Sequence, residues 1–113
     1  MMQMTDSVPQ HVHDCVVTRV IADCEARTLM LHATGTDDRG PFEIIFNDVR
    51  AWSVDNVLEG NILFAIEDIG TPNQLPDELV PASDQREFVI SSSYGMTGRV
   101  IGSSWTTRPR SRD

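Results

Sequence analysis

The sequence predicts a single all-β domain, either a bent antiparallel sheet or a small, partly open barrel of about six strands. Short runs of alternating apolar and polar side chains recur along the chain, and Gly, Pro and Asp separate them, as is typical of antiparallel pairing. No stretch of ten or more residues has a convincing helical period. A length of 113 residues fits one domain with one modest core.

Six segments alternate as strands do: 16–21, 27–34, 41–46, 61–69, 86–93 and 98–105. Turns at 22–26 and 35–40 separate the first three strands, and YGMT makes a hairpin between the last two. A loop rich in proline and acid, 70–85, follows the fourth strand. The less regular piece 47–58 could instead form a short helix, with Val49, Trp52 and Leu58 on one face. We assign residues 1–107 to the domain and 108–113 to a disordered arginine-rich tail.

The alternation also predicts which side chains form the core. The expected core face carries these residues: Leu29, Leu31, Ala33, Phe42, Ile44, Phe46, Ile62, Phe64, Ile66, Phe88 and Ile90. The opposite face is not simply polar, because it holds Met30, Ile45, Leu63 and Val89. Something partly covers that face: the 70–85 loop, which is the simplest cover, a second copy of the chain, or another protein. If another chain covers it, we expect a homodimer.

The charge of the chain is strongly negative. Nine basic residues, all of them arginine, stand against 17 acidic residues, which gives a net charge of −8. A nucleic-acid-binding domain needs a basic surface, so this balance argues against one. It favours solubility and rapid encounter with a basic protein partner, for which the loop residues Asp77 and Glu78 are candidate contacts.

Neither a membrane span nor a secretory signal is visible. No run approaches the ~18 apolar residues of a transmembrane helix, and MMQMTDSVPQ has neither a basic nor an apolar signal region. A cytoplasmic location is therefore expected. In that compartment disulfides are reduced, so we expect Cys15 and Cys24 to be thiols.

The stretch HVHDCVV raises the question of a metal site. On a strand, His11 and His13 would point to the same face, as two ligands of one zinc or iron ion must. The chain has one further histidine, His32, and both His11 and His13 come before the apolar run, where the chain enters the sheet. We expect these side chains to hydrogen-bond locally and expect no bound metal and no cofactor.

No set of catalytic residues stands out. The serines of SSSYG and GSSW lack a nucleophile elbow, and neighbouring acids such as Glu67 and Asp68 point to opposite faces of a strand. His13 and Cys15 lack a third, orienting group. The chain is therefore expected not to be an enzyme.

The parts of the chain also form a familiar arrangement. His13-Asp14 comes before VVTRVI, and RTLMLHA, FEIIF, NDV, GNILFAIEDI and SYG follow in that order. This arrangement resembles several families of small uncharacterised bacterial proteins, some of them candidate immunity proteins of polymorphic toxin systems. The resemblance covers about two-thirds of the chain, and its motifs are structural. It implies an all-β fold and a toxin-binding role, and it brings no catalytic residues with it.

Three functional classes remain open. The first is a non-enzymatic acidic protein-binding module, with toxin immunity as its role. The second is a small-ligand-binding β-barrel whose mouth is lined by Trp52, Phe64 and Trp105, although small barrels are usually filled by their own side chains. The third is a cupin-like metal-dependent enzyme that uses the three histidines. We favour the first class.

Overall fold

The computed structural model describes residues 12–35, 40–71 and 85–110, and these ranges contain eight β-strands and no helix. The strands are β1 (Val16–Asp23), β2 (Thr28–Thr34), β3 (Pro41–Asn47), β4 (Ala51–Asp55), β5 (Asn61–Asp68), β6 (Arg86–Tyr94), β7 (Thr97–Gly102) and β8 (Ser104–Pro109). The all-β prediction is confirmed, with eight strands in place of about six. No helix in the described ranges is long and apolar enough to cross a membrane.

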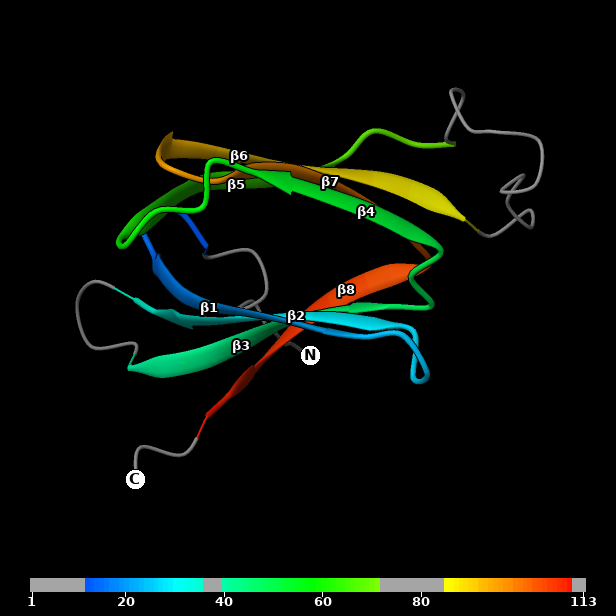
Figure 1. Cartoon of the computed structure of the whole chain (residues 1–113), viewed down its shortest axis with the longest axis horizontal. Coiled ribbons are helices and arrows are strands. Elements are labelled where there is room, and N and C mark those ends of the chain that lie inside the picture. The colour runs from blue at the N-terminus through cyan, green and yellow to red at the C-terminus, as the bar shows by residue number, and fades with distance from the viewer. Residues whose placement is uncertain (1–11, 36–39, 72–84, 111–113) are drawn as a thin grey trace, which may run out of the picture.

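The eight strands form one antiparallel sheet in the order β4-β7-β6-β5-β1-β2-β3-β8. The sheet folds over on itself, so that β4 to β7 form an upper layer and β1, β2, β3 and β8 form a lower one (Figure 1). The sheet bends between β1 and β5, which pair at Val16↔Ile62 and Val17↔Asn61. Such a short ladder lets the sheet turn sharply, which confirms the predicted bend.

The segment 98–105, predicted as one strand, is two strands that belong to different layers. β7 ends at Gly102 and β8 begins at Ser104. The backbone N–H of Ser103 donates to the carbonyl oxygen of Asn47 at 2.9 Å. A Cβ on Gly102 would lie 2.6 Å from the same oxygen. The chain therefore crosses between the layers where only glycine fits.

Two further elements differ in detail from the sequence analysis. The segment around Trp52 forms strand β4 and no helix, because Trp52 and Val54 pair with Val100 and Gly98 of β7. Strand β8 runs on to Pro109, past the expected end of the domain at 107. This extension is stabilised by pairing with β3, and Arg108 Nε donates a 2.6 Å hydrogen bond to Glu43 Oε1. Residues 111–113 of the expected tail lie outside the described residues.

The core lies between the two layers. The expected inward residues of β2, β3 and β6 are all buried: Leu29, Leu31, Ala33, Phe42, Ile44, Phe46, Phe88 and Ile90. The cluster also includes Val12, Cys15 and Val17 from the start of β1 and the segment before it. Val49 of the β3–β4 link, Met96 of the β6–β7 turn and Val100 of β7 complete this list. At roughly 1.5–3 kcal/mol per buried large apolar side chain, this cluster is the main source of stability.

Strand β5 departs from the predicted face pattern. Leu63 is fully buried and Phe64 is 53% exposed, which is the reverse of the expectation. The β5–β6 register shifts between Ile62 and Leu63 and again between Leu63 and Ala65. The extra residue is Ser93 of β6 in the first shift and Phe64 of β5 in the second, so the side chains of β5 change their alternation between faces at Phe64. Ile66, beyond the bulges, packs against the core as predicted.

The predicted second-face residues therefore do not form one surface. Met30 and Ile45 are half-buried neighbours in register on β2 and β3. Val89 is half-buried on β6, in the other layer, and Leu63 belongs to the core. Asp77 and Glu78 lie outside the described residues. The expectation that Leu63 lies on the second face is wrong.

The two cysteines lie on either side of β1. Cys15 is buried before this strand and Cys24 is exposed after it. Nine residues of extended chain put their Cα atoms roughly 25–30 Å apart, whereas a disulfide needs about 7 Å or less. No disulfide joins the two residues.

Asn61 ties three segments together where the layers meet. Its side chain is 2% exposed, and Oδ1 accepts from the backbone N–H groups of Leu58 (2.7 Å) and Met96 (3.0 Å). Nδ2 donates to the carbonyl oxygens of Leu58 (2.9 Å) and Val17 (3.3 Å). The amide thus makes two bonds as acceptor and two as donor, which satisfies its usual capacity.

The reversed faces of β5 give a first prediction. Leu63→Ala should lower the free energy of unfolding by about 2–5 kcal/mol, because it leaves a cavity in the core. Phe64→Ala removes a larger side chain but an exposed one, and should lower it by less than about 1 kcal/mol. Urea denaturation of both variants measures this difference. A larger loss from Phe64→Ala would show that the face assignment of β5 is wrong.

The second prediction concerns Asn61. Asn61→Ala should destabilise the protein by about 2–5 kcal/mol, because four hydrogen bonds are lost and buried backbone groups are left without partners. Asn47→Ala is the matched control, since the Asn47 amide makes one exposed 3.3 Å bond to Ser104 Oγ. The control should cost less than about 1 kcal/mol. Equal losses in chemical denaturation would contradict the assigned role of Asn61.

Candidate protein-binding surface

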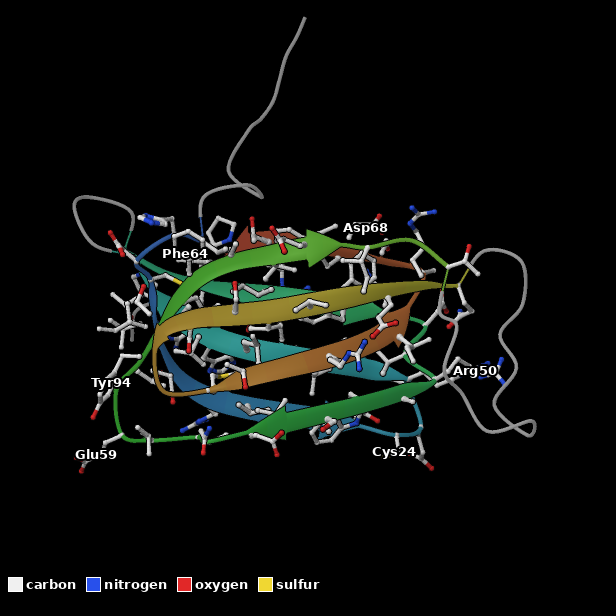
Figure 2. The ribbon with its side chains drawn as sticks, turned by 90° about the horizontal axis from the view of Figure 1, so that it is seen from above. Cys24, Arg50, Glu59, Phe64, Asp68 and Tyr94 are labelled. Carbon is white, nitrogen blue, oxygen red and sulfur yellow. The ribbon has the colours of Figure 1, made fainter. Side chains whose placement is uncertain are left out.

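Four large apolar side chains are exposed at one end of the molecule. We call them the aromatic end, and their exposed fractions range from 46% to 56%: Val57, Leu58, Phe64 and Tyr94. Tyr94 lies opposite Ile62, which stands two residues before Phe64. Asn61 bonds to both Leu58 and Met96, which brings the β4–β5 connection close to the turn after Tyr94. Phe64 and Tyr94 are seen at the same end of the molecule in Figure 2.

The backbone of the aromatic end is firmly held. Asn61 binds Leu58 in the β4–β5 connection and Met96 in the β6–β7 turn, so the two segments share one anchor. Gly95, beside Tyr94, has a φ of +90°, and a Cβ there would lie 2.4 Å from Asn61 Oδ1. A glycine is thus required at this position, and it lets the turn close over Asn61. Val57 and Tyr94 project from segments that are fixed before any partner arrives.

Phe64 is turned outward by the bulges of β5 and is braced by His13. The two rings make an edge contact, with centroids 5.2 Å apart and planes at 67°. His13 Nδ1 lies 3.3 Å from Asp14 Oδ2, and the Asp14 backbone N–H donates to the Leu63 carbonyl oxygen at 2.8 Å. The segment before β1 is thereby tied to β5. Its histidine supports an exposed aromatic ring.

Acidic side chains accompany the apolar ones. Asp14 has a side chain that is 53% exposed beside His13, and Glu59 is exposed in the β4–β5 connection. Figure 2 shows Glu59 at the same end as Tyr94. Asp55, the last residue of β4, is also exposed. The aromatic end therefore combines apolar area with negative charge.

The histidines take different places in the fold. His32 Nε2 lies 3.4 Å from Glu43 Oε2, and Arg108 binds the other oxygen of Glu43, so the three side chains form a row across β2, β3 and β8. His13 belongs to the aromatic end, and His11 lies outside the described residues. Within the described ranges, no three His, Cys, Asp or Glu side chains gather as a metal site would require. The absence of a bound metal stays a prediction.

Asp68, the last residue of β5, forms an ion pair with Arg86, the first residue of β6. Arg86 Nε donates a 2.6 Å hydrogen bond to Asp68 Oδ2 and thereby lowers the pKa of this carboxyl. The Gly70 backbone N–H and the Arg86 charge lower the pKa further, while slight burial opposes them. Because the folded pKa is depressed, this pair stabilises the fold above the unfolded pKa of about 4, and its contribution is lost as pH falls through the folded pKa. The pair is exposed, so its contribution is small.

The aromatic residues expected at a barrel mouth do not meet. Trp105 packs against Phe46 of the core, with ring centroids 6.3 Å apart. Phe64 belongs to the aromatic end, whereas Trp52 is a 43% exposed residue of β4. Trp52 instead lines a surface depression together with Arg50, which Figure 2 shows at the end opposite Tyr94. The predicted ligand mouth is therefore absent from the part of the chain that the structure describes.

Three of the four residues of the aromatic end were not predicted from the sequence to belong to a binding surface. Val57 and Leu58 stand between Asn56 and Glu59, in a segment treated as irregular, and Tyr94 stands in a predicted turn. Large apolar residues inside connections could have indicated this surface, because a connection usually lies at the surface and its side chains are exposed. Phe64 was predicted as a core residue and, in the ligand-binding alternative, as part of a barrel mouth.

Comparison with known families, proteins and solved structures finds a structural similarity. No family model matches it, and no curated protein matches it. Among solved structures it is similar to one described as an uncharacterized protein from Neisseria gonorrhoeae. The two share 12% sequence identity over 87% of this chain and 93% of the other, with a TM-score of 0.49.

Proposed function

We propose that this protein is a non-enzymatic protein-binding module that binds a basic protein partner through its aromatic end. The observation that carries the proposal is the group of exposed apolar side chains on a backbone fixed by Asn61. Aromatic residues are enriched among those that contribute most to protein–protein binding. A surface that is already ordered loses little conformational entropy on binding.

The charge of the chain supports the choice of a basic partner. Asp14 and Glu59 accompany the apolar side chains, and the whole chain has a net charge of −8. Complementary charge speeds encounter and disfavours acidic competitors. Toxin immunity is the biological role we propose, in line with the resemblance in the sequence, and the cytoplasm is the proposed location.

A second surface supports self-association. Ile21 lies opposite Met30 on the neighbouring strand, and Met30 lies opposite Ile45, so three apolar side chains form a row across β1, β2 and β3. Ile21 is 36% exposed, and the other two are half-buried. We propose that a second copy covers this row in a homodimer, since symmetric pairs are the commonest assembly.

Affinity capture from the native host tests the binding proposal. The wild-type chain and the Phe64→Ala/Tyr94→Ala variant serve as baits, and quantitative mass spectrometry compares the captured proteins. We expect at least one basic protein to be lost with the double variant, because its main apolar contacts are removed. Titration of that purified protein should give a Kd at least tenfold weaker for the double variant, and binding that weakens with added salt.

Ile69→Ala is the matched control, because Ile69 is 51% exposed and follows Asp68, away from Tyr94 in Figure 2. It should leave capture unchanged. If the double variant captures the same proteins with the same affinity as the wild type, the aromatic end is not the binding surface. A toxin gene beside the gene for this chain would supply the first partner to titrate.

The homodimer has its own test. Ile45→Glu places a charge in the apolar row, on β3, and should convert a dimer into a monomer in sedimentation velocity runs. Ser93→Glu, an exposed change on β6, should leave the dimer intact. A wild-type monomer at every concentration would exclude the homodimer. Leu63 is unsuitable for this experiment because it is buried in the core.

A further inference from the structure

A surface depression of about 240 Å³ lies between the end of β1 and the start of β4, beside the β3–β4 link. Beyond Val17, strand β1 pairs only with β2 within the described residues, and β4 pairs only with β7. The depression opens between these two layer edges. Its walls come from the end of β1, the β1–β2 turn and the start of β4. Cys24 and Arg50 in these walls lie at the end of the molecule opposite Tyr94 (Figure 2).

Two arginines and a tryptophan line the depression: Arg27, Arg50 and Trp52. The backbone holds both arginines in place. The Arg27 carbonyl oxygen accepts from the Val49 N–H at 2.8 Å, and the Arg50 N–H donates to the Ile101 carbonyl oxygen at 2.8 Å. The turn and the β3–β4 link are therefore bonded to each other, and the two side chains start from fixed positions.

Neither guanidinium is neutralised by a carboxylate in the described part of the chain. Arg86, Arg99 and Arg108 each form an ion pair, whereas none involves Arg27 or Arg50. The chain has 17 acidic residues for nine arginines, so partners are abundant. Two arginines that form no ion pair within the described ranges and an exposed tryptophan therefore line one depression on an acidic molecule.

One oxygen of the only carboxylate among the described residues of the wall, that of Asp23, is already engaged. Asp23 Oδ1 accepts hydrogen bonds from the backbone N–H groups of Glu25 (3.1 Å) and Ala26 (3.0 Å), which closes the β1–β2 turn. Asx turns of this kind are a common use of aspartate. Asp23 therefore shapes the turn that presents Arg27, and its Oδ1 is not available to pair with the guanidinium groups.

We propose that the depression binds a small molecule made of one flat ring and one anionic group, a carboxylate or a phosphate. Guanidinium groups bind both anions with paired N–H donors. The face of the Trp52 indole offers a surface for stacking a ring. The volume is below the ~300–1,000 Å³ of pockets for drug-sized ligands, so a single ring fits the space better than a larger molecule.

Arg27 offers a test that does not confuse binding with stability. Its φ of 59° is in the left-handed region, where a side chain is strained and glycine is not. Arg27→Gly removes the guanidinium and relieves this strain, so the thermal midpoint should stay equal or rise. Arg19→Gln is the matched control, because it removes one charge from an exposed residue of β1 that does not line the depression.

The experiment follows the Trp52 indole N–H signal in ¹⁵N-correlated NMR spectra, assigned with Trp52→Phe, while ligands are added at constant ionic strength. The probes are phenyl phosphate and benzoate, which distinguish the two anions, with inorganic phosphate and phenol as their separate parts. We expect saturable binding of at least one ring-bearing anion, a Kd at least tenfold weaker in Arg27→Gly, and no change in Arg19→Gln. No saturable shift, equal binding by Arg27→Gly, an equal loss in Arg19→Gln, or inorganic phosphate binding as tightly as phenyl phosphate would each overturn the proposal.

Discussion

The hydrogen bonds of one buried amide decide how this sheet can fold. Asn61 stands at the first residue of β5, where β5 pairs with β1, and its side chain bonds to three separate segments. A buried amide without partners would cost several kcal/mol. With all its bonds made, it instead fixes the β4–β5 connection and the β6–β7 turn against the start of β1. The place where the sheet bends is thus also the most specifically bonded place in the core.

Glycines allow close packing of the backbone along β7 and at the point where the chain passes from β7 to β8. Gly102 lies against the carbonyl oxygen of Asn47, and Gly98 would place a Cβ 2.7 Å from the carbonyl oxygen of Ser53. Any larger residue at either position would push β7 away from its neighbour. The close approach lets one continuous segment serve the upper layer as β7 and the lower layer as β8. The β1–β5 ladder, the β3–β4 link and the passage from β7 to β8 join the two layers, and the depression lies beside the β3–β4 link.

The sequence predicted those strands whose faces alternate without interruption. The inward positions of Leu29, Leu31 and Ala33 in β2 were predicted correctly, because every second side chain is buried along the whole strand. It failed at Leu63 and Phe64, since a bulge depends on the partner strand and leaves no local sign. Strand β4 was obscured because Val49 and Trp52 have helical spacing, while its pairing with β7 joins residues more than 40 positions apart. The aromatic end and the depression were missed for the same reason, since both gather residues from distant connections.

The aromatic end and the depression differ in how their side chains relate to the rest of the structure. At the aromatic end, Asn61 satisfies the backbone N–H groups of Leu58 and Met96. The exposed apolar side chains there contribute little to the stability of the fold. At the depression, the lining includes two arginines that form no ion pair within the described residues. Substitutions at well-separated positions with no shared contacts usually act independently. The Tyr94 and Arg50 ends lie on opposite sides of the core (Figure 2), so each surface can change without loss of the other.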